Sequence, residues 1–371
     1  MPRTRRWSRP VSRRVLAFLK VEGVRNLAAQ EVPLDNRIVV LMGDNAQGKS
    51  ALLEAAYMLA TTRSFRCRDP RQAICWNAER LTIHGKVLAG GDRPPLTLAL
   101  SRSRRRGDRR LLVGECEVEL AEYLGVLPAL AMTGDSSRSI AGSPKERRRY
   151  IDRGTAAARP EHLQDLSRYR RALSERNALL RQGAADEAFE PWEAILAGLG
   201  ESIRRRREEE ITAWQAGFGA LADLFPEAGR MRLVYRETGN SELREELSKR
   251  REDDRRTGVT ASGPHRDDFL IEVDGHSLWA FGSAGQIRSA LAATTLAQAA
   301  RVRESRLGSE PLLVLDDLDS DLDSRRLGGL LEAASGLGQV LAATCKPGLP
   351  LPSHVLRLVV SEGKVSVRKD V

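Results

Sequence analysis

The sequence feature that most constrains the fold is the glycine-rich stretch Gly43-Asp44-Asn45-Ala46-Gln47-Gly48-Lys49-Ser50. It matches the G-x-x-x-x-G-K-[ST] pattern of a phosphate-binding loop. The preceding residues, 37–42, are apolar and β-branched and predict a buried strand, whereas the following residues, 51–60, are strong helix formers. A strand, a glycine-rich turn and a helix in this order form the context that the motif requires. The chain is therefore predicted to contain an α/β nucleotide-binding domain rather than a chance glycine-rich turn.

Each residue type in this loop has a physical role in binding phosphate. Gly43 and Gly48 let the backbone pass close to an anion, and the N–H groups of the loop and of the first helical turn point at the phosphates. Lys49 supplies a mobile positive charge for the terminal phosphates, and Ser50 supplies a hydroxyl for Mg²⁺. The candidate nucleotide contacts in this stretch are Gly43, Asn45, Gln47, Gly48, Lys49, Ser50 and Ala51.

The charge of the chain favours an anionic partner. Its 371 residues carry a formal net charge of +10, and such a surface attracts polyanions, of which nucleic acid is the usual one. A generally solvated basic surface explains the charge equally well. No apolar run reaches the roughly 18 residues of a membrane span, so no membrane partner is expected. The four cysteines lack C-x-x-C spacing, which disfavours zinc and disulfides and fits a cytoplasmic location.

The first third of the chain combines predicted strands with arginine-rich turns. Residues 1–14 form a basic tail ahead of the first strand. Strands are predicted at 15–21, 81–87, 96–100 and 111–113. The stretch 101–110 is predicted to be an arginine-rich hairpin tip. Its arginines, like Arg63, Arg66 and Arg68, are either contacts to the phosphates of nucleotide or DNA or ordinary solvated residues, and the residues alone leave both interpretations open.

The middle of the chain, residues 141–257, is predicted to form a mostly helical lobe. Its stretch Ser143-Pro144-Lys145-Glu146 completes a capping box with proline at the first helical position. From 161 to 223, apolar residues recur at three- and four-residue steps, which predicts two antiparallel helices joined by a turn at 183–189. The run 204–210, four arginines followed by three glutamates, is interpreted as a solvated helix face with i,i+4 ion pairs.

Further candidate site residues follow the lobe. Residues 312–315 form an apolar strand that ends in two carboxylates. Asp316 can hold Mg²⁺ beside the loop serine, and Asp317 can orient or deprotonate a water that attacks the terminal phosphate. Ser283 and Gly285 lie at a helix start, where a hydroxyl and N–H groups can meet an anion, although an ordinary helix cap explains them more simply. A last strand, 338–344, ends in the hydroxyl of Thr344.

Taken together, these segments resemble the RecF family of DNA replication and repair proteins, which are ATPases of the ABC/SMC-like head type. The likeness is carried by GDNAQGKSALLEAAYMLATTRSFR, GSPKERRRYID, SGPHRDDF, FGSAGQ and LLVLDDLDSDLD. The resemblance implies an α/β P-loop head formed by residues 15–140 and 258–371, with the helical lobe 141–257 inserted. It also implies that two ATP molecules are sandwiched between two subunits.

The resemblance implies a role for each matching residue. The loop residues would bind ATP, and Ser50 and Asp316 would hold Mg²⁺. Ser283, Gly285 and Gln286 would match the ABC signature and reach the γ-phosphate across the dimer. Asp317 would stand where most ABC enzymes place a catalytic glutamate, and Lys49 and Thr344 would be the other catalytic residues. Ser320 and Asp323 would belong to the D-loop, and Thr344 would occupy the switch position. The chain departs from the family pattern at Ala46 and at 131–135.

The function implied by the resemblance is an ATP-dependent DNA-binding protein of recombinational repair and replication-fork maintenance. In this hypothesis ATP closes a homodimer on duplex DNA near single-strand/double-strand junctions, a RecR/RecO-type mediator assists recombinase loading, and hydrolysis is weak and coupled to DNA. One alternative is a divergent paralogue that serves another partner, such as a defence system. Another is a transporter nucleotide-binding subunit, which the inserted helical lobe disfavours.

Overall fold

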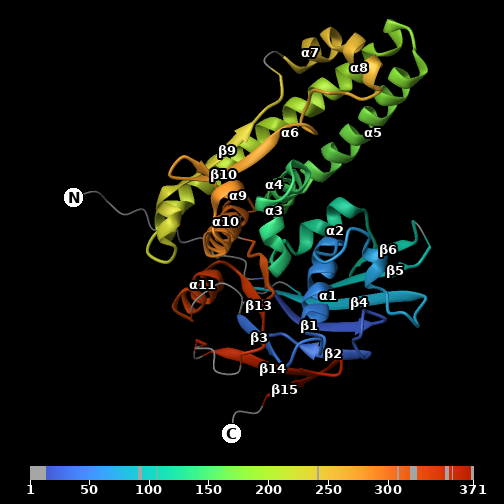
Figure 1. Cartoon of the computed structure of the whole chain (residues 1–371). Coiled ribbons are helices and arrows are strands. Elements are labelled where there is room, and N and C mark those ends of the chain that lie inside the picture. Colours follow the sequence, from blue (N-terminus) through green and yellow to red (C-terminus); the bar gives the residue numbers. More distant parts are fainter. Residues whose placement is uncertain are drawn as a thin grey trace. The chain divides into compact units, whose positions relative to one another are not determined.

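The computed structural model describes residues 14–90, 94–105, 107–239, 242–306, 309–317, 324–346, 351–352 and 354–368. The chain divides into two compact units, which are seen by their sequence colours in Figure 1. Unit 1 comprises Met1–Thr133 and Ala299–Val371, and unit 2 comprises Gly134–Gln298. The predicted basic tail, 1–14, lies outside the described residues except for Arg14, with which the first strand begins.

Unit 1 contains a six-stranded, mostly parallel sheet with the strand order β15-β14-β3-β13-β12-β8. Strand β3 is buried along its whole length, as expected for an apolar, β-branched run inside a parallel sheet. The strand predicted before the phosphate-binding loop is thereby confirmed, as are those that precede Asp316 and end at Thr344. The strands of this sheet are β3 (Ile38–Met42), β8 (Ala129–Met132), β12 (Leu312–Leu315), β13 (Gln339–Thr344), β14 (Val355–Ser361) and β15 (Lys364–Val367).

A second sheet of unit 1 is antiparallel, with the order β2-β1-β4-β5-β6-β7. The helix α1 (Lys49–Thr61) contacts strands of both sheets, and nearly all of its residues are buried. A helix that is apolar around its circumference suits this enclosed position, which also fixes the phosphate-binding loop at its start. The remaining elements of unit 1 are β1 (Arg14–Glu22), β2 (Gln30–Pro33), η1 (Pro70–Ala73), β4 (Arg80–Ala89), β5 (Leu96–Ser103), β6 (Arg109–Val113), β7 (Cys116–Glu117), α2 (Leu120–Val126) and α11 (Ser324–Leu337).

Unit 2 is mostly helical, as predicted. Helices α5 (Glu161–Gln182) and α6 (Glu190–Gly217) pack against each other, and Gly183 ends α5 with a left-handed φ of +63°. Helix α4 (Pro144–Ala158) begins with the predicted capping box, in which Ser143 N donates to Glu146 Oε2 at 2.9 Å. A three-stranded sheet has the order β11-β10-β9. The other elements of unit 2 include α3 (Ser137–Ala141), β9 (Met231–Arg236), α7 (Leu243–Lys249), α8 (Arg251–Thr257), β10 (Asp268–Val273), β11 (His276–Ser277), α9 (Leu278–Phe281) and the first part of α10 (Ala284–Ser305).

The arginine run of α6 is not the solvated face that its charge pattern suggested. Arg204 and Arg207 are 7% and 2% exposed. Arg204 donates two hydrogen bonds to the carboxylate of Asp267, at 2.8 and 2.9 Å. Arg207 likewise donates two hydrogen bonds to the carboxylate of Asp152 on α4. Arg205 does form the expected i,i+4 pair with Glu209. The interpretation is wrong for the two buried arginines because α6 packs against α4 and β9 along this side.

The two units divide the sequence differently from the predicted head and lobe. Unit 2 begins at Gly134 and continues to Gln298, whereas the sequence predicts a lobe at 141–257. The reason is that β10 pairs with β9 over its whole length, which ties the SGPHRDDF stretch to the lobe. None of the helices in the described part of the chain is long and apolar enough to cross a membrane.

Candidate nucleotide-binding site

The phosphate-binding loop of unit 1 connects β3 to α1 with the backbone that the motif predicts. Gly43 and Gly48 have φ values of +148° and +114°, a region that favours glycine. A Cβ atom on Gly43 would lie 2.3 Å from the carbonyl oxygen of Val360, so no larger residue fits there. Ala46 also has a positive φ, +63°, at one of the positions where the chain departs from the family pattern. The loop therefore keeps its fold with an alanine in a strained conformation.

Lys49 is folded back onto the loop that carries it. Its Nζ donates to the carbonyl oxygens of Gly43 and Asp44, both at 2.7 Å, and the residue is 9% exposed. At the start of α1, Gly48 provides no side-chain cap and the first turn holds no acidic residue. The N–H groups of this turn, including those of Ser50 and Ala51, have no acceptor within the helix. The loop thus offers N–H donors and an ammonium group at one end of the sheet.

The two other candidate contacts in the loop differ from each other. Asn45 is exposed. Gln47 is an anchor, since its Oε1 accepts from Glu362 N at 2.6 Å and its carbonyl oxygen accepts from Gly363 N at 2.9 Å. The side chain of Gln47 is therefore used to hold the loop against the turn between β14 and β15.

The structure brings Ser50 and Asp316 together from opposite ends of the sequence. Ser50 Oγ donates to Asp316 Oδ1 at 2.9 Å. Asp316 is 8% exposed, and burial raises its pKa above the usual aspartate value, although the Ser50 hydrogen bond opposes this. A hydroxyl and a buried carboxylate are oxygen ligands of the kind that Mg²⁺ prefers. The donor set therefore fits a magnesium ion, and binding a cation would remove the cost of burying this charge.

Asp317 and Thr344 lie at the same edge of the parallel sheet. Asp317 follows Asp316 directly, is exposed, and has a left-handed φ of +56°. Non-glycine residues in this conformation are strained, and such strain concentrates at functional sites. Thr344 pairs in register with Met42, the last residue before the loop, and its Oγ1 accepts from Lys346 N at 3.0 Å. The predicted D-loop residues Ser320 and Asp323 lie outside the described residues.

Ser283, Gly285 and Gln286 belong to unit 2, at the start of α10. Ser283 N donates to Gln286 Oε1 at 2.9 Å, and Gln286 N donates to Ser283 Oγ at 3.2 Å. This reciprocal pair is a helix cap, the simpler of the two explanations that the sequence allowed. Ser283 is exposed.

Sequence reasoning missed a buried carboxylate on α1. Glu54 is fully buried, four residues beyond Ser50. Arg25 binds it through Nε and Nη2, both at 2.9 Å, and Ser64 Oγ also donates to it. Arg66 Nη1 lies 3.9 Å from Glu54 Oε2, and the charge of Arg66 acts to lower the pKa of Asp316. Glu54 thus anchors the loop that brings Arg66 near the predicted magnesium ligand. Its signal was a lone acidic residue in an apolar helix.

Comparison with known proteins shows the family of the chain. No family model matches the chain. A DNA replication and repair protein RecF of Moorella thermoacetica is 33% identical over 86% of this chain and 86% of its own length. The chain belongs to the RecF family. Another member, from Bacillus subtilis, is 30% identical over 88% of this chain and 92% of its own length.

Solved structures confirm the predicted fold class. The structure of the recombination mediator protein RecF-ATP in the RecFOR pathway matches with a TM-score of 0.87 and 24% identity, over 98% of this chain and all of that one. An SMC head domain from Pyrococcus furiosus matches with a TM-score of 0.53 and 16% identity, over 96% of each chain. The chain therefore has the ABC/SMC-like ATPase head fold with an inserted helical lobe.

Proposed function

We propose that this chain is an ATP-dependent DNA-binding protein of recombinational repair and replication-fork maintenance. Dimers clamp duplex DNA near single-strand/double-strand junctions, and hydrolysis of ATP is slow and coupled to DNA. The observation that carries the proposal is the 2.9 Å hydrogen bond between Ser50 and Asp316, beside the phosphate-binding loop, in a member of the RecF family.

The first step is the binding of ATP to unit 1. Lys49 exchanges the carbonyl oxygens of Gly43 and Asp44 for phosphate oxygens, and the N–H groups of the first turn of α1 donate to the phosphates. Ser50 and Asp316 would hold Mg²⁺, which would supply positive charge to neutralise the phosphates. The support is that Ser50 Oγ donates to Asp316 Oδ1, and that Asp316 and the loop both follow strands of the same parallel sheet.

The second step is hydrolysis, in which Asp317 acts on water. Its carboxylate orients the attacking water or accepts its proton, and Thr344 stands at the strand end beside the loop. An aspartate is one methylene shorter than the glutamate found in most ABC enzymes. We therefore expect turnover to be slow, which suits a clamp that stays closed while ATP is bound.

The third step is dimer closure. In this proposal Ser283, Gly285 and Gln286 of a second copy reach the γ-phosphate that the first copy holds. The support is that Ser283 is exposed at the start of α10, where N–H groups and a hydroxyl can bind an anion. Closing the dimer through ATP makes DNA binding depend on the nucleotide.

The DNA partner follows from charge and from the family. The net charge of +10 attracts a polyanion, and the relatives are DNA replication and repair proteins. A RecR/RecO-type mediator is the expected protein partner, because a structural neighbour belongs to the RecFOR pathway. This chain would help to load recombinase at gaps.

The test is the affinity for duplex DNA with and without ATP, at moderate salt. We expect ATP to raise the affinity of the wild-type protein and to leave that of Lys49→Met unchanged. A wild-type protein whose duplex affinity does not respond to ATP would refute the clamp.

A further inference from the structure

Buried polar atoms without a hydrogen-bond partner collect in the interior of unit 2. In the part of the chain that the structure describes, they include Tyr150 Oη and Thr155 Oγ1 on α4, His162 Nδ1 on α5, Trp214 Nε1 on α6 and Gln298 Nε2 on α10. Each of these residues is at most 5% exposed. Leaving a buried polar atom unpaired is costly, so such atoms are almost always bonded to protein or to water. Their concentration in one part of the fold therefore indicates a ligand.

Gly154 of α4 brings the indole of α6 and the amide of α10 together. A Cβ atom on Gly154 would lie 2.7 Å from Trp214 Cζ2 and 2.8 Å from Gln298 Nε2. The glycine thus lets both side chains reach the same point on α4. Only one ring carbon separates Trp214 Nε1 from Cζ2. The two unpaired nitrogens are therefore neighbours in the interior of unit 2.

The hydroxyl of Tyr150 belongs to the same place. Tyr150 lies four residues before Gly154, on the same face of α4. Burial raises the pKa of Tyr150 to about 12, and Thr295, Thr294 and Gln298 lie near enough to the hydroxyl to oppose the rise. None of these three side chains has the geometry of a hydrogen bond to Tyr150 Oη. The hydroxyl and the Gln298 amide are therefore close to each other without bonding directly.

Phe269 of β10 holds the two aromatic rings in place. The Tyr150 ring stacks on it with the ring centroids 6.3 Å apart, and the Trp214 ring meets it edge-on at 6.4 Å. On α10, Thr294 Oγ1 already donates to Ala290 O of its own helix at 2.6 Å. Rings packed in this way have little freedom to turn their polar atoms toward other partners.

The chemistry of the three unpaired atoms selects the ligand. The indole N–H of Trp214 and the amide N–H groups of Gln298 are all donors and cannot bond to each other, whereas the Tyr150 hydroxyl can donate or accept. A ligand that joins them has to accept two hydrogen bonds and form a third. Buried water typically makes about three hydrogen bonds. Water is also neutral, which matters because burying an ion costs far more than burying a neutral polar molecule.

We propose that a water molecule is bound inside unit 2, where it accepts hydrogen bonds from Trp214 Nε1 and Gln298 Nε2 and donates one to Tyr150 Oη. This water joins α4, α6 and α10. Helix α10 is rich in alanine, whose side chain forms no hydrogen bonds, so the water supplies polar contacts that most of the helix lacks. Because α10 begins after Ser283, the water also holds the helix that presents this serine. All of these groups lie in unit 2, and the inference does not depend on ATP or on DNA.

The direct test is a crystal structure of the full-length protein at a resolution that shows ordered water. We expect density for one water within hydrogen-bonding distance of Trp214 Nε1, Gln298 Nε2 and Tyr150 Oη. The proposal is overturned if no density lies between these atoms. It is also overturned if the amide is turned so that Gln298 Oε1 accepts directly from Trp214 Nε1.

The sign of a stability change provides an independent test in solution. Tyr150→Phe and Gln298→Met each remove one partner of the water and keep most of the side-chain volume. Each variant is expected to lower the urea midpoint and to speed hydrogen exchange in α4 and α10, because the remaining groups lose a hydrogen bond. If the atoms bind no ligand, the same substitutions remove an unsatisfied buried group and raise the midpoint, which would overturn the proposal.

The matched control is Tyr123→Phe. Tyr123 of α2 lies in unit 1, is fully buried, and its hydroxyl also lacks a hydrogen-bond partner among the described residues. Tyr123→Phe is expected to raise the urea midpoint or to leave it unchanged. A fall as large as that of Tyr150→Phe would overturn the proposal, because the loss would not then report on the water.

A double variant tests whether the two groups share one ligand. Tyr150→Phe combined with Gln298→Met is expected to lower the urea midpoint by less than the sum of the two single changes, since both substitutions remove partners of the same water. Strictly additive changes would overturn the shared site.

Discussion

Replacing Asp267 by asparagine is expected to destabilise unit 2 strongly. Asp267 is fully buried within the SGPHRDDF stretch. Its carboxylate accepts two hydrogen bonds from Arg204, one from Tyr235 Oη at 2.7 Å, and two from the backbone N and Oγ1 of Thr238, both at 2.8 Å. The substitution keeps the shape but removes the charge, and it places an amide donor among these donors.

The magnitude follows from the geometry of the pair. Breaking a buried ion pair by neutralising one partner costs about 3–5 kcal/mol, because the other charge stays buried without compensation. Arg204 also lies 3.1 Å from Glu237, which compensates part of its charge, so the lower end of about 3 kcal/mol is expected. Urea denaturation at neutral pH, with hydrogen exchange in β9 and β10, measures the loss.

The dependence on pH gives a second check. Burial alone would raise the pKa of Asp267, but the hydrogen bonds and charge of Arg204 and the Thr238 N–H hold it below the usual aspartate value. A lowered carboxylate pKa contributes stability that is present above the unfolded-state value and is lost as the pH falls through the folded-state value. The difference between the wild type and Asp267→Asn should therefore shrink in acid.

Asp253→Asn is the matched control, because Asp253 forms an exposed pair with Arg256 on α8. Its effect is expected to stay within about 0.5 kcal/mol. The reasoning is refuted if the free energy of unfolding of Asp267→Asn lies within about 1 kcal/mol of the wild-type value. It is also refuted if Asp253→Asn loses as much stability as Asp267→Asn.

Three further predictions concern other parts of the chain. Glu54→Gln leaves Arg25 without its buried partner and is expected to cost about 3 kcal/mol in urea denaturation and to increase hydrogen exchange in the 62–69 loop; unchanged exchange would contradict this. Ala46→Gly relieves a left-handed alanine and is expected to stabilise unit 1 by up to roughly 1 kcal/mol, measured as the shift of the urea midpoint; a destabilised variant would count against it. Burial lowers the pKa of His265 to about 4. The wild type should therefore lose stability as the pH falls from about 6.5 to 4, and its loss should be steeper than that of His265→Gln. NMR titration of the ring measures the pKa directly.

The elements that sequence reasoning found are those that local patterns specify. The strand, loop and helix around Lys49 are encoded within a short stretch, because glycine spacing and apolar runs determine them without help from distant residues. The capping box at Ser143 is another such case. A strand that ends in acidic residues, combined with the loop motif, was enough to predict that Asp316 would meet Ser50.

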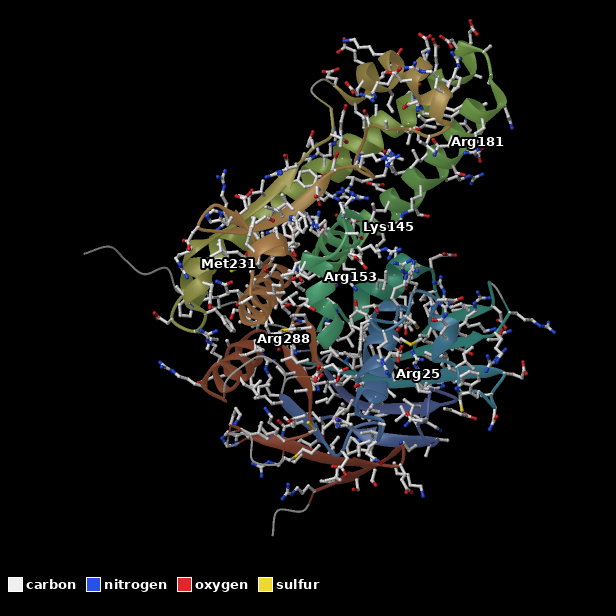
Figure 2. All side chains as sticks on the ribbon, viewed as in Figure 1. Arg25, Lys145, Arg153, Arg181, Met231 and Arg288 are labelled. Carbon is white, nitrogen blue, oxygen red and sulfur yellow. The ribbon has the colours of Figure 1, made fainter. Side chains whose placement is uncertain are left out.

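What the sequence did not reveal depends on contacts between distant segments. Nothing in the charge pattern of α6 indicates that Arg204 is buried, since its partner Asp267 is 63 positions away. Pairing of β9 with β10 likewise keeps residues beyond 258 in unit 2, and periodicity within either strand cannot show this. Figure 2 shows side chains with nitrogen and oxygen atoms along both units. Some of the charged side chains, such as Arg204, are buried. Glu54 was overlooked because a single acidic residue in a helix is usually exposed.

The most direct test of the account is whether ATP joins two copies of this chain. Size-exclusion chromatography with light scattering would compare the wild type, Lys49→Met and Asp317→Asn, each with and without ATP. We predict dimers of the wild type only with ATP, no dimers of Lys49→Met, and dimers of Asp317→Asn that persist because ATP is not hydrolysed. A wild-type protein that stays monomeric with ATP, or a Lys49→Met protein that dimerises as well as the wild type, would contradict the account.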